Sequence, residues 1–175
     1  MIRGFRNVDF GVGASGRLRS LVVAFCLLFA LALLAAESRG ADGAAMQQLT
    51  DLRQESQILK QQKLVLVLEF ASDDCGYCRK LEKLFLLPMQ RNAAYDDKIL
   101  IRSISMSDFE TVIDFDGRSL TTNELASRYG VELTPTMLFL GPDGTELSER
   151  LVGIWSEDFY GAFIDNRIDE ARKRL

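Results

Sequence analysis

Two cysteines three positions apart, Cys75 and Cys78, are the residues of this chain whose type and spacing could carry chemistry. A thiolate attacks disulfides, and a second thiol about one helical turn away can close back onto the first. The same pair could form half of a zinc or iron–sulfur site, which needs about four nitrogen or sulfur ligands. The 175-residue chain has no histidine and one further cysteine, Cys26. The composition therefore favours dithiol redox chemistry over metal binding.

The segments on either side of the cysteine pair predict a strand before it and a helix after it. Residues 64–68 form an apolar run with the length and branching of a buried strand. In residues 79–87 the apolar positions recur at helical spacing, and Pro88 then breaks or kinks the helix. Cys75 therefore lies at a helix N-terminus, where unpaired N–H groups and the helix dipole favour a thiolate.

Residues 1–40 predict a secretory signal peptide. Four arginines in residues 1–19 precede an uninterrupted apolar run at 21–34, and small residues follow it. Cleavage after Ala36 or after Gly40 fits this pattern. An uncleaved membrane anchor is the alternative, because the apolar run is at the lower limit for a spanning helix.

The remaining residues, 41–175, predict one exported domain. Loss of the signal would remove Cys26 and leave only Cys75 and Cys78, a pairing that suits an oxidising compartment such as a bacterial periplasm. The whole chain carries a net charge of −4, and several of its arginines lie in the N-terminal segment. An acidic domain disfavours nucleic acid as a partner.

Apolar periodicity and turn signals divide this domain into alternating helices and strands. The first two expected helices cover residues 44–62 and the segment after the cysteines. A third begins with a capping box of Thr121 and Glu124 and ends at Gly130, and a last helix is capped by Ser156. The expected strands cover residues 64–68, 99–104, 136–140 and 145–152, with a hairpin at 111–120 around Asp116 and Gly117. The last helix is expected to bury one apolar stripe, which comprises Phe159, Tyr160, Phe163, Ile164 and Ile168. Trp155, Phe159 and Phe163 are expected in the core rather than around a cofactor.

Three features together resemble the thioredoxin fold: the cysteine motif, the Thr134-Pro135-Thr136 sequence, and Gly153 after the last strand. The resemblance implies an α/β fold with a central mixed sheet flanked by helices. Here an N-terminal helix would replace the first strand, and the hairpin near 111–120 would be an addition. These departures are similar to the SoxW-type periplasmic thioredoxins, whereas the CGYC motif also occurs in periplasmic disulfide isomerases.

The resemblance implies roles for six residues around the expected site. Cys75 would be the nucleophile and Cys78 the resolving thiol, and the two would form the redox-active disulfide without a metal or a bound cofactor. Substrate would contact Gly76, Tyr77, Thr134 and Pro135. Pro135 would follow a cis peptide bond, whereas statistics alone favour an ordinary trans proline.

Glu69 lies six residues before Cys75, where thioredoxins carry a buried acid that accepts the proton of the resolving thiol. A carboxyl in an apolar strand should have a raised pKa, which suits proton transfer near neutral pH. Arg102 is a candidate cationic neighbour. The alternative is that the strand frays and Glu69 points to water.

The chain departs from thioredoxins at Asp73 and Asp74, because thioredoxins usually have a tryptophan directly before the first cysteine. Two carboxylates disfavour a nearby thiolate, whereas Arg79 and Lys80 favour it. The thiolate pKa and the redox potential therefore depend on the balance of these opposing charges.

The function expected from these features is that of an exported, monomeric thiol–disulfide oxidoreductase. It would reduce disulfides of proteins or small molecules and receive electrons from a membrane thiol donor. A non-catalytic peptide-binding or chaperone module is the alternative, and a binder would tolerate Cys75→Ser. A copper-delivery domain is disfavoured, because such sites recruit histidine beside the thiols. Isomerase activity would usually need a separate dimerisation domain, and none is apparent.

Overall fold

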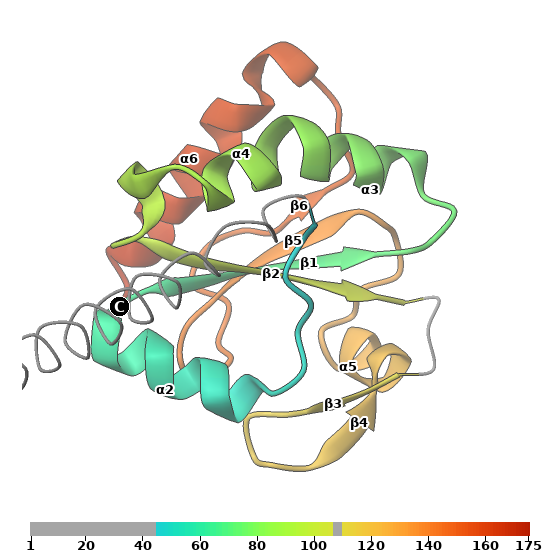
Figure 1. Ribbon diagram of the computed structural model, residues 1–175, viewed down its shortest axis with the longest axis vertical. Helices are drawn as coiled ribbons and strands as arrows, with labels where there is room; N and C mark the ends of the chain where they lie inside the picture. The colour runs from blue at the N-terminus through green and yellow to red at the C-terminus, as the bar shows by residue number, and fades with distance from the viewer. Residues whose placement is uncertain (1–44, 107–109) are drawn as a thin grey trace, which may run out of the picture. The chain divides into compact units, whose positions relative to one another are not determined.

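A four-stranded sheet forms the centre of the structure (Figure 1). This computed structural model describes residues 45–106 and 110–175, which lie in a compact unit of residues 43–175. The strand order is β2 (Ile99–Ser105), β1 (Val65–Ala71), β5 (Thr136–Leu140) and β6 (Leu151–Val152). β1 is parallel to β2, whereas β5 is antiparallel to both of its neighbours. The mixed sheet confirms the predicted α/β class.

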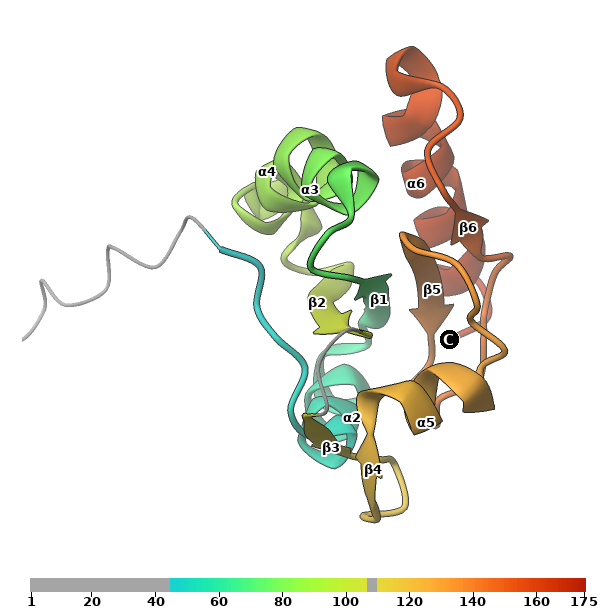
Figure 2. The same ribbon diagram turned by 90° about the vertical axis from the view of Figure 1, so that its right-hand side faces the viewer.

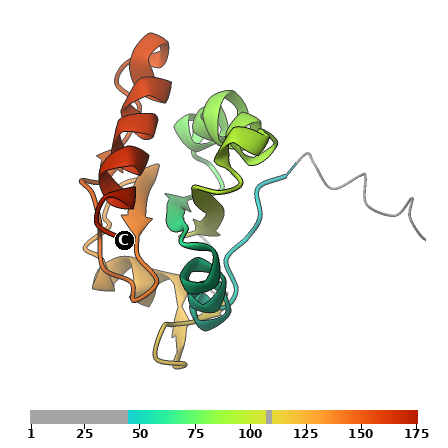
Figure 3. The same ribbon diagram turned by 90° about the vertical axis from the view of Figure 1, so that its left-hand side faces the viewer.

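Helices cover both faces of this sheet (Figures 1 and 2). One face carries α3 (Gly76–Leu81), a π-helical turn (Glu82–Leu86), α4 (Leu87–Gln90) and α6 (Glu157–Arg172), and Figure 3 shows α6 beside the α3–α4 segment. The other face carries α2 (Leu52–Gln62), α5 (Thr122–Arg128) and the small sheet of β3 (Thr111–Ile113) and β4 (Ser119–Thr121). A 3₁₀ turn, Ala93–Tyr95, precedes β2.

Strand β1 contributes to both apolar cores because its side chains alternate between the two faces. Val65 and Val67 pack with the helices of the α3 and α6 side. Leu66 and Leu68 pack with α2 and α5. Every residue of β1 is buried, so the strand firmly holds the start of the loop that leads from it to Cys75.

The elements with local sequence signals form as predicted. β5 occupies residues 136–140, and the hairpin of β3 and β4 turns through Gly117 at a φ of 85°. The Thr121 hydroxyl and the Glu124 carboxylate form a reciprocal capping box at the start of α5. The predicted replacement of the first strand by a helix is also confirmed, because α2 precedes β1.

The N-terminal helix is shorter than the predicted 44–62. Asp51 caps it by accepting hydrogen bonds from the backbone N–H groups of Arg53 and Gln54. The chain before Asp51 is extended instead: the backbone of Gln47 and Leu49 bonds to Ser103 on the edge of β2. Residues 47–49 thus form hydrogen bonds with the unpaired backbone groups at the edge of β2 instead of extending the helix.

Two further boundaries differ from the prediction. Pro88 does not break its helix, which continues to Gln90; the helix instead widens into a π-helical turn over Glu82–Leu86, which ends two residues before the proline. The last strand is limited to Leu151–Val152, because residues 141–150 turn back with a single bridge between Leu140 and Glu146.

The prediction that Trp155, Phe159 and Phe163 lie in the core is wrong. Their exposed fractions are 54%, 66% and 38%, whereas Tyr160 is fully buried. α6 buries only the narrower stripe that faces the sheet, which comprises Tyr160, Ile164, Ile168 and Ala171. Trp155 packs its edge against the Tyr160 ring at 5.1 Å between centroids.

Within residues 45–106 and 110–175, no helix has the length and hydropathy needed to cross a bilayer. The signal or anchor predicted at residues 1–40 lies outside the described residues.

Candidate active site

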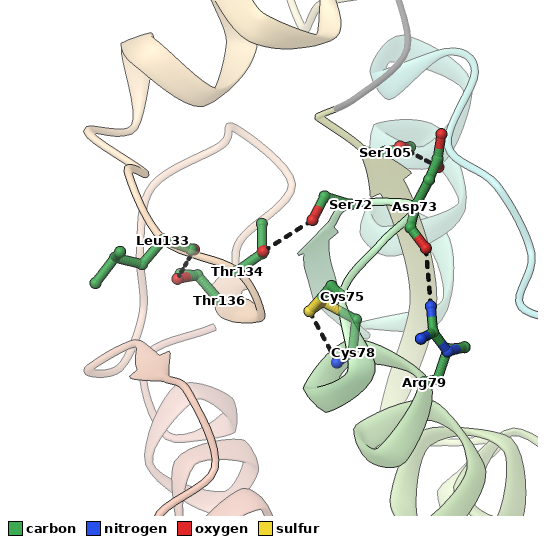
Figure 4. Close-up of a disulfide and its surroundings, with 9 residues drawn as sticks. All are labelled: Ser72, Asp73, Cys75, Cys78, Arg79, Ser105, Leu133, Thr134 and Thr136. Carbon is green, nitrogen blue, oxygen red and sulfur yellow. Dashed lines mark hydrogen bonds between the residues drawn. A yellow bond between two sulfur atoms is a disulfide. The ribbon is translucent and has the colours of Figure 1, made fainter.

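The predicted cysteine pair forms a disulfide at the start of α3. Cys75 is the N-cap residue, and its sulfur accepts a hydrogen bond from the backbone N–H of Cys78 at 3.0 Å (Figure 4). Cys75 is half-buried, whereas Cys78 is only 2% exposed. A reaction partner therefore meets Cys75 before Cys78.

The loop before Cys75 is tied to its surroundings on both sides. The Cys75 backbone N–H donates to the Ser72 carbonyl at 3.1 Å. The Arg79 guanidinium donates to the Asp73 carbonyl at 2.8 Å, and Ser105 donates to the Asp73 carboxylate at 3.0 Å (Figure 4).

Lys80 forms an ion pair with Glu157 at the start of α6. The two basic residues thus position the loop and the helix as well as contributing charge.

Gly76 and Tyr77, the two residues between the cysteines, are exposed, and the Tyr77 side chain retains 63% of its accessible surface. A flat aromatic ring beside a half-buried disulfide offers an apolar surface to an approaching chain. Both residues therefore lie where the resemblance places a substrate contact.

The loop before β5 faces the disulfide. The peptide bond between Thr134 and Pro135 is cis, as the resemblance implies. Thr136 donates its hydroxyl to the Leu133 carbonyl at 2.7 Å, and Gly153 donates its N–H to the Pro135 carbonyl at 2.8 Å. Within the described residues, the backbone N–H and carbonyl of Thr134 have no backbone partner. Thr134 therefore offers one unpaired strand position to an incoming extended chain.

Glu69 is fully buried in β1 and does not point to water. It shares the strand face of Val65 and Val67, which packs against the helical side that carries Cys78. Neither carboxylate oxygen has a hydrogen-bond partner among the described residues. Burial, with a smaller contribution from the charge of Glu82, raises the pKa of Glu69 to about 8, and the nearby Ser103 hydroxyl opposes this rise without completing a hydrogen bond. An acid of this pKa can exchange a proton at neutral pH.

Arg102 is not the cationic neighbour of Glu69. In the parallel ladder Arg102 lies opposite Leu68, and Glu69 lies opposite Ser103, so the two side chains point to opposite faces. The Arg102 guanidinium instead forms an ion pair with Glu55 of α2 at 2.6 Å. The register of the two strands determines which side chains share a face of the sheet, and the sequence alone does not show that register.

Two polar residues join this site that the sequence reasoning did not single out. Ser72 shares a hydrogen bond of 3.1 Å with Thr134 (Figure 4), a contact between residues 62 positions apart that no local signal reveals. Glu82 is partly buried, which raises its pKa, and the charge of Arg79 opposes that rise. Its spacing of four residues from Cys78 on one helical run could have identified it.

No cluster of three or more metal-binding side chains occurs within the described parts of the chain. The polar groups near the disulfide include a buried acid, a hydroxyl pair and backbone amides. These groups can bind an extended chain and move a proton.

Comparison with known proteins agrees with this geometry. A family model for a thioredoxin-like domain matches residues 52–167. Over 90 residues the chain is 34% identical to the thiol:disulfide interchange protein DsbD of Pseudomonas fluorescens, a match that covers 50% of this chain and 14% of DsbD. This chain therefore spans only a small part of that relative.

The solved structure of the DsbH oxidoreductase has the same fold. The DsbH oxidoreductase matches with a TM-score of 0.51 at 17% identity, over 76% of this chain and 92% of DsbH. The periplasmic thioredoxin SoxS from Paracoccus pantotrophus matches with a TM-score of 0.42 at 21% identity, over 61% of this chain and 98% of SoxS. The family match covers more than half of the sequence and includes the cysteine pair, Thr134 and Pro135. The chain belongs to the thioredoxin-like domain family, with Cys75 and Cys78 as its redox-active cysteine pair.

Proposed function

We propose that this protein is an exported thiol–disulfide oxidoreductase that reduces disulfide bonds of polypeptides. The observation that carries the proposal is that Cys75, a half-buried residue, lies beside the unpaired backbone of Thr134 (Figure 4). A reactive sulfur next to an open strand position suits a disulfide within an extended chain. The 34% identity to a thiol:disulfide interchange protein supports the same chemistry.

The reaction proceeds through two exchange steps. The Cys75 thiolate of the reduced protein attacks one sulfur of the substrate disulfide, forms a mixed disulfide and releases the other substrate sulfur as a thiolate. Cys78 then loses its proton and attacks the Cys75 sulfur, which releases the second substrate thiolate. Two electrons pass to the substrate, and the protein is left with the Cys75–Cys78 disulfide. A membrane thiol donor would reduce that disulfide and restore the dithiol.

Glu69 would accept the proton that Cys78 loses in the second step. The carboxyl is buried on the strand face toward the helix that carries Cys78. With a pKa raised to about 8 by burial, the carboxylate is basic enough to take a proton from a thiol, and its ionised fraction, which grows as the pH approaches 8, would carry out this step.

Export to a periplasm is supported by the arginine-rich and apolar pattern of residues 1–40. Likeness to the SoxW-type thioredoxins is supported by the helix in place of the first strand and by the added hairpin. The chain would act as a monomer. Its acidic charge gives no reason to expect nucleic acid as a partner.

The test is reduction of insulin by the mature protein with dithiothreitol as electron source, followed by turbidity. The proposal predicts catalysis by the wild type and none by Cys75→Ser. The alternative, a non-catalytic peptide-binding module, predicts that both proteins bind an extended peptide and that neither accelerates reduction. Equilibration with glutathione then gives the direction of electron flow. A reductase should have a potential nearer to about −270 mV than to about −120 mV.

A further inference from the structure

The register of the β1–β5 ladder brings Ser72 opposite Thr134. Backbone pairs run from Leu66–Leu140 to Phe70–Thr136, and two more residues along each strand lead to Ser72 and Thr134. Pro135 has no N–H, so the backbone ladder does not continue normally at this point. The two hydroxyl groups meet instead, at 3.1 Å (Figure 4). A side-chain hydrogen bond therefore extends the strand pairing beyond its last backbone pair.

Ser72 is connected to the nucleophile as well. Its carbonyl accepts the backbone N–H of Cys75 at 3.1 Å, and it directly follows the buried strand β1. One residue thus links the Cys75 loop through its backbone and the Thr134 loop through its side chain. Among the described residues, the Ser72–Thr134 contact is the one hydrogen bond that joins Ser72 or residues 74–78 to residues 133–135.

The Thr134 loop has other supports, but they lie on its far side. Thr136 and Gly153 hold the carbonyls of Leu133 and Pro135, and neither contact reaches the cysteine loop. Loss of the Ser72 hydroxyl would therefore leave the loop folded but free to move relative to Cys75. The property that depends on this hydroxyl is the spacing between the nucleophile and the unpaired backbone of Thr134.

We infer that Ser72 is a positioning residue, which holds the Thr134 backbone at the spacing from Cys75 that an extended polypeptide disulfide requires. The inference rests on the proposed reduction of polypeptide disulfides. A polypeptide must pair with Thr134 and present its sulfur to Cys75 at the same time. A small disulfide needs only the sulfur. Ser72 therefore sets the preference for polypeptide substrates over small disulfides.

The experiment compares kcat and KM for insulin and for 5,5′-dithiobis(2-nitrobenzoic acid), a small disulfide. Ser72→Ala should raise KM for insulin about fivefold, the effect of one neutral hydrogen bond, with kcat changed less than KM. The ratio of kcat/KM for insulin to kcat/KM for the small disulfide should fall by about the same factor. Ser72→Thr keeps the hydroxyl and should restore the ratio.

Two further variants isolate the contact. Thr134→Val removes the partner hydroxyl at nearly constant volume and should raise KM for insulin like Ser72→Ala. The double variant should show no further rise, because both changes remove one hydrogen bond. Ser56→Ala is the matched control: it removes a serine hydroxyl that donates to the Pro142 carbonyl, a contact that involves neither the cysteine loop nor the Thr134 loop, and should leave the ratio unchanged.

The outcomes separate this inference from the proposed function. Wild-type protein that reduces the small disulfide but not insulin contradicts the proposed function and the inference with it. Wild-type protein active on both, with Ser72→Ala lowering both activities by the same factor, contradicts the inference alone. Failure of Ser72→Thr to restore the ratio, or independent effects in the double variant, also overturns it.

Discussion

Glu69 and Ser103 lie opposite each other in the parallel ladder of β1 and β2, and the serine hydroxyl does not complete a hydrogen bond to the carboxylate. Glu69 is thus a fully buried acid without a hydrogen-bond partner among the described residues, on the strand face directed toward the dithiol helix. Burial without a hydrogen-bond partner disfavours the charged carboxylate relative to the neutral carboxylic acid. Two consequences can be measured, one in stability and one in kinetics.

The stability prediction concerns Glu69→Gln. Burial raises the pKa of Glu69 from 4.5 to about 8 in the folded chain, so the folded state keeps its proton over a range in which the unfolded state loses it. This contribution to stability is complete below pH 4.5 and is lost as the pH rises to about 8. Glutamine does not titrate. The variant should therefore match the wild type near pH 4 and exceed its free energy of unfolding by on the order of 5 kcal/mol near pH 9.

Denaturant melts of both proteins across this pH range provide the measurement. A difference in unfolding free energy that stays constant from acid to alkaline pH would show that Glu69 does not titrate with a raised pKa.

The kinetic prediction concerns the same variant. Glu69→Gln keeps the shape of the side chain and removes its basicity, so the attack of Cys78 on the mixed disulfide should slow. The loss should be about 10²-fold, the lower end for general-base assistance, because thiols are already acidic. The first attack by Cys75 should change little, and stopped-flow measurement of the two steps separates them. Equal slowing of both steps would assign Glu69 a structural role.

The sequence predicted those parts of the fold that depend on local signals. The Thr121–Glu124 capping box and the Gly117 turn formed as expected, because each is determined by residues within one turn of each other. Features set by tertiary contacts were missed. The start of α2 depends on the free edge of β2, which pairs with residues 47–49.

The same distinction applies to the site. Cys75, Cys78 and Pro135 were found because their motifs are local or match a family pattern. Glu69 was placed by its distance from Cys75, and its burial is as expected. The pairing of Ser72 with Thr134 depends on the register of two strands joined by a long segment, so it could not be read from spacing.

The exposed aromatic residues of α6 give a third prediction. Phe159 is 66% exposed and Tyr160 is fully buried, although they are neighbours in sequence. Phe159→Ala should change the free energy of unfolding by about 1 kcal/mol or less. Tyr160→Ala should lower it by about 3–5 kcal/mol through loss of buried area and the cavity left behind. Urea titrations of the pair test this, and similar losses for both variants would place the Phe159 side chain in the core.

A fourth prediction concerns Asp114, whose side chain is fully buried in the turn of the hairpin. Burial alone would raise its pKa, but the backbone N–H of Arg118 and the Arg128 guanidinium outweigh burial and lower the pKa to about 2. The resulting stability is present above pH 3.8 and is lost as the pH falls through about 2.

Asp114→Asn should therefore be less stable than the wild type at pH 7, and this deficit should shrink as the pH falls from 3.8 toward 2. Thermal melts at several pH values measure it. A deficit that is independent of pH in this range would contradict the role of the Asp114 charge.

The most direct test of the dithiol mechanism is to trap its intermediate. Cys78→Ala removes the resolving thiol, so Cys75 should accumulate in stable mixed disulfides with client polypeptides. Cys75→Ala should trap none, because Cys78 is only 2% exposed. Non-reducing gels, with mass spectrometry of the adducts, identify the linked cysteine. Adducts on Cys75 in the first variant and none in the second are the predicted result, and equal trapping by both variants would contradict Cys75 as the nucleophile.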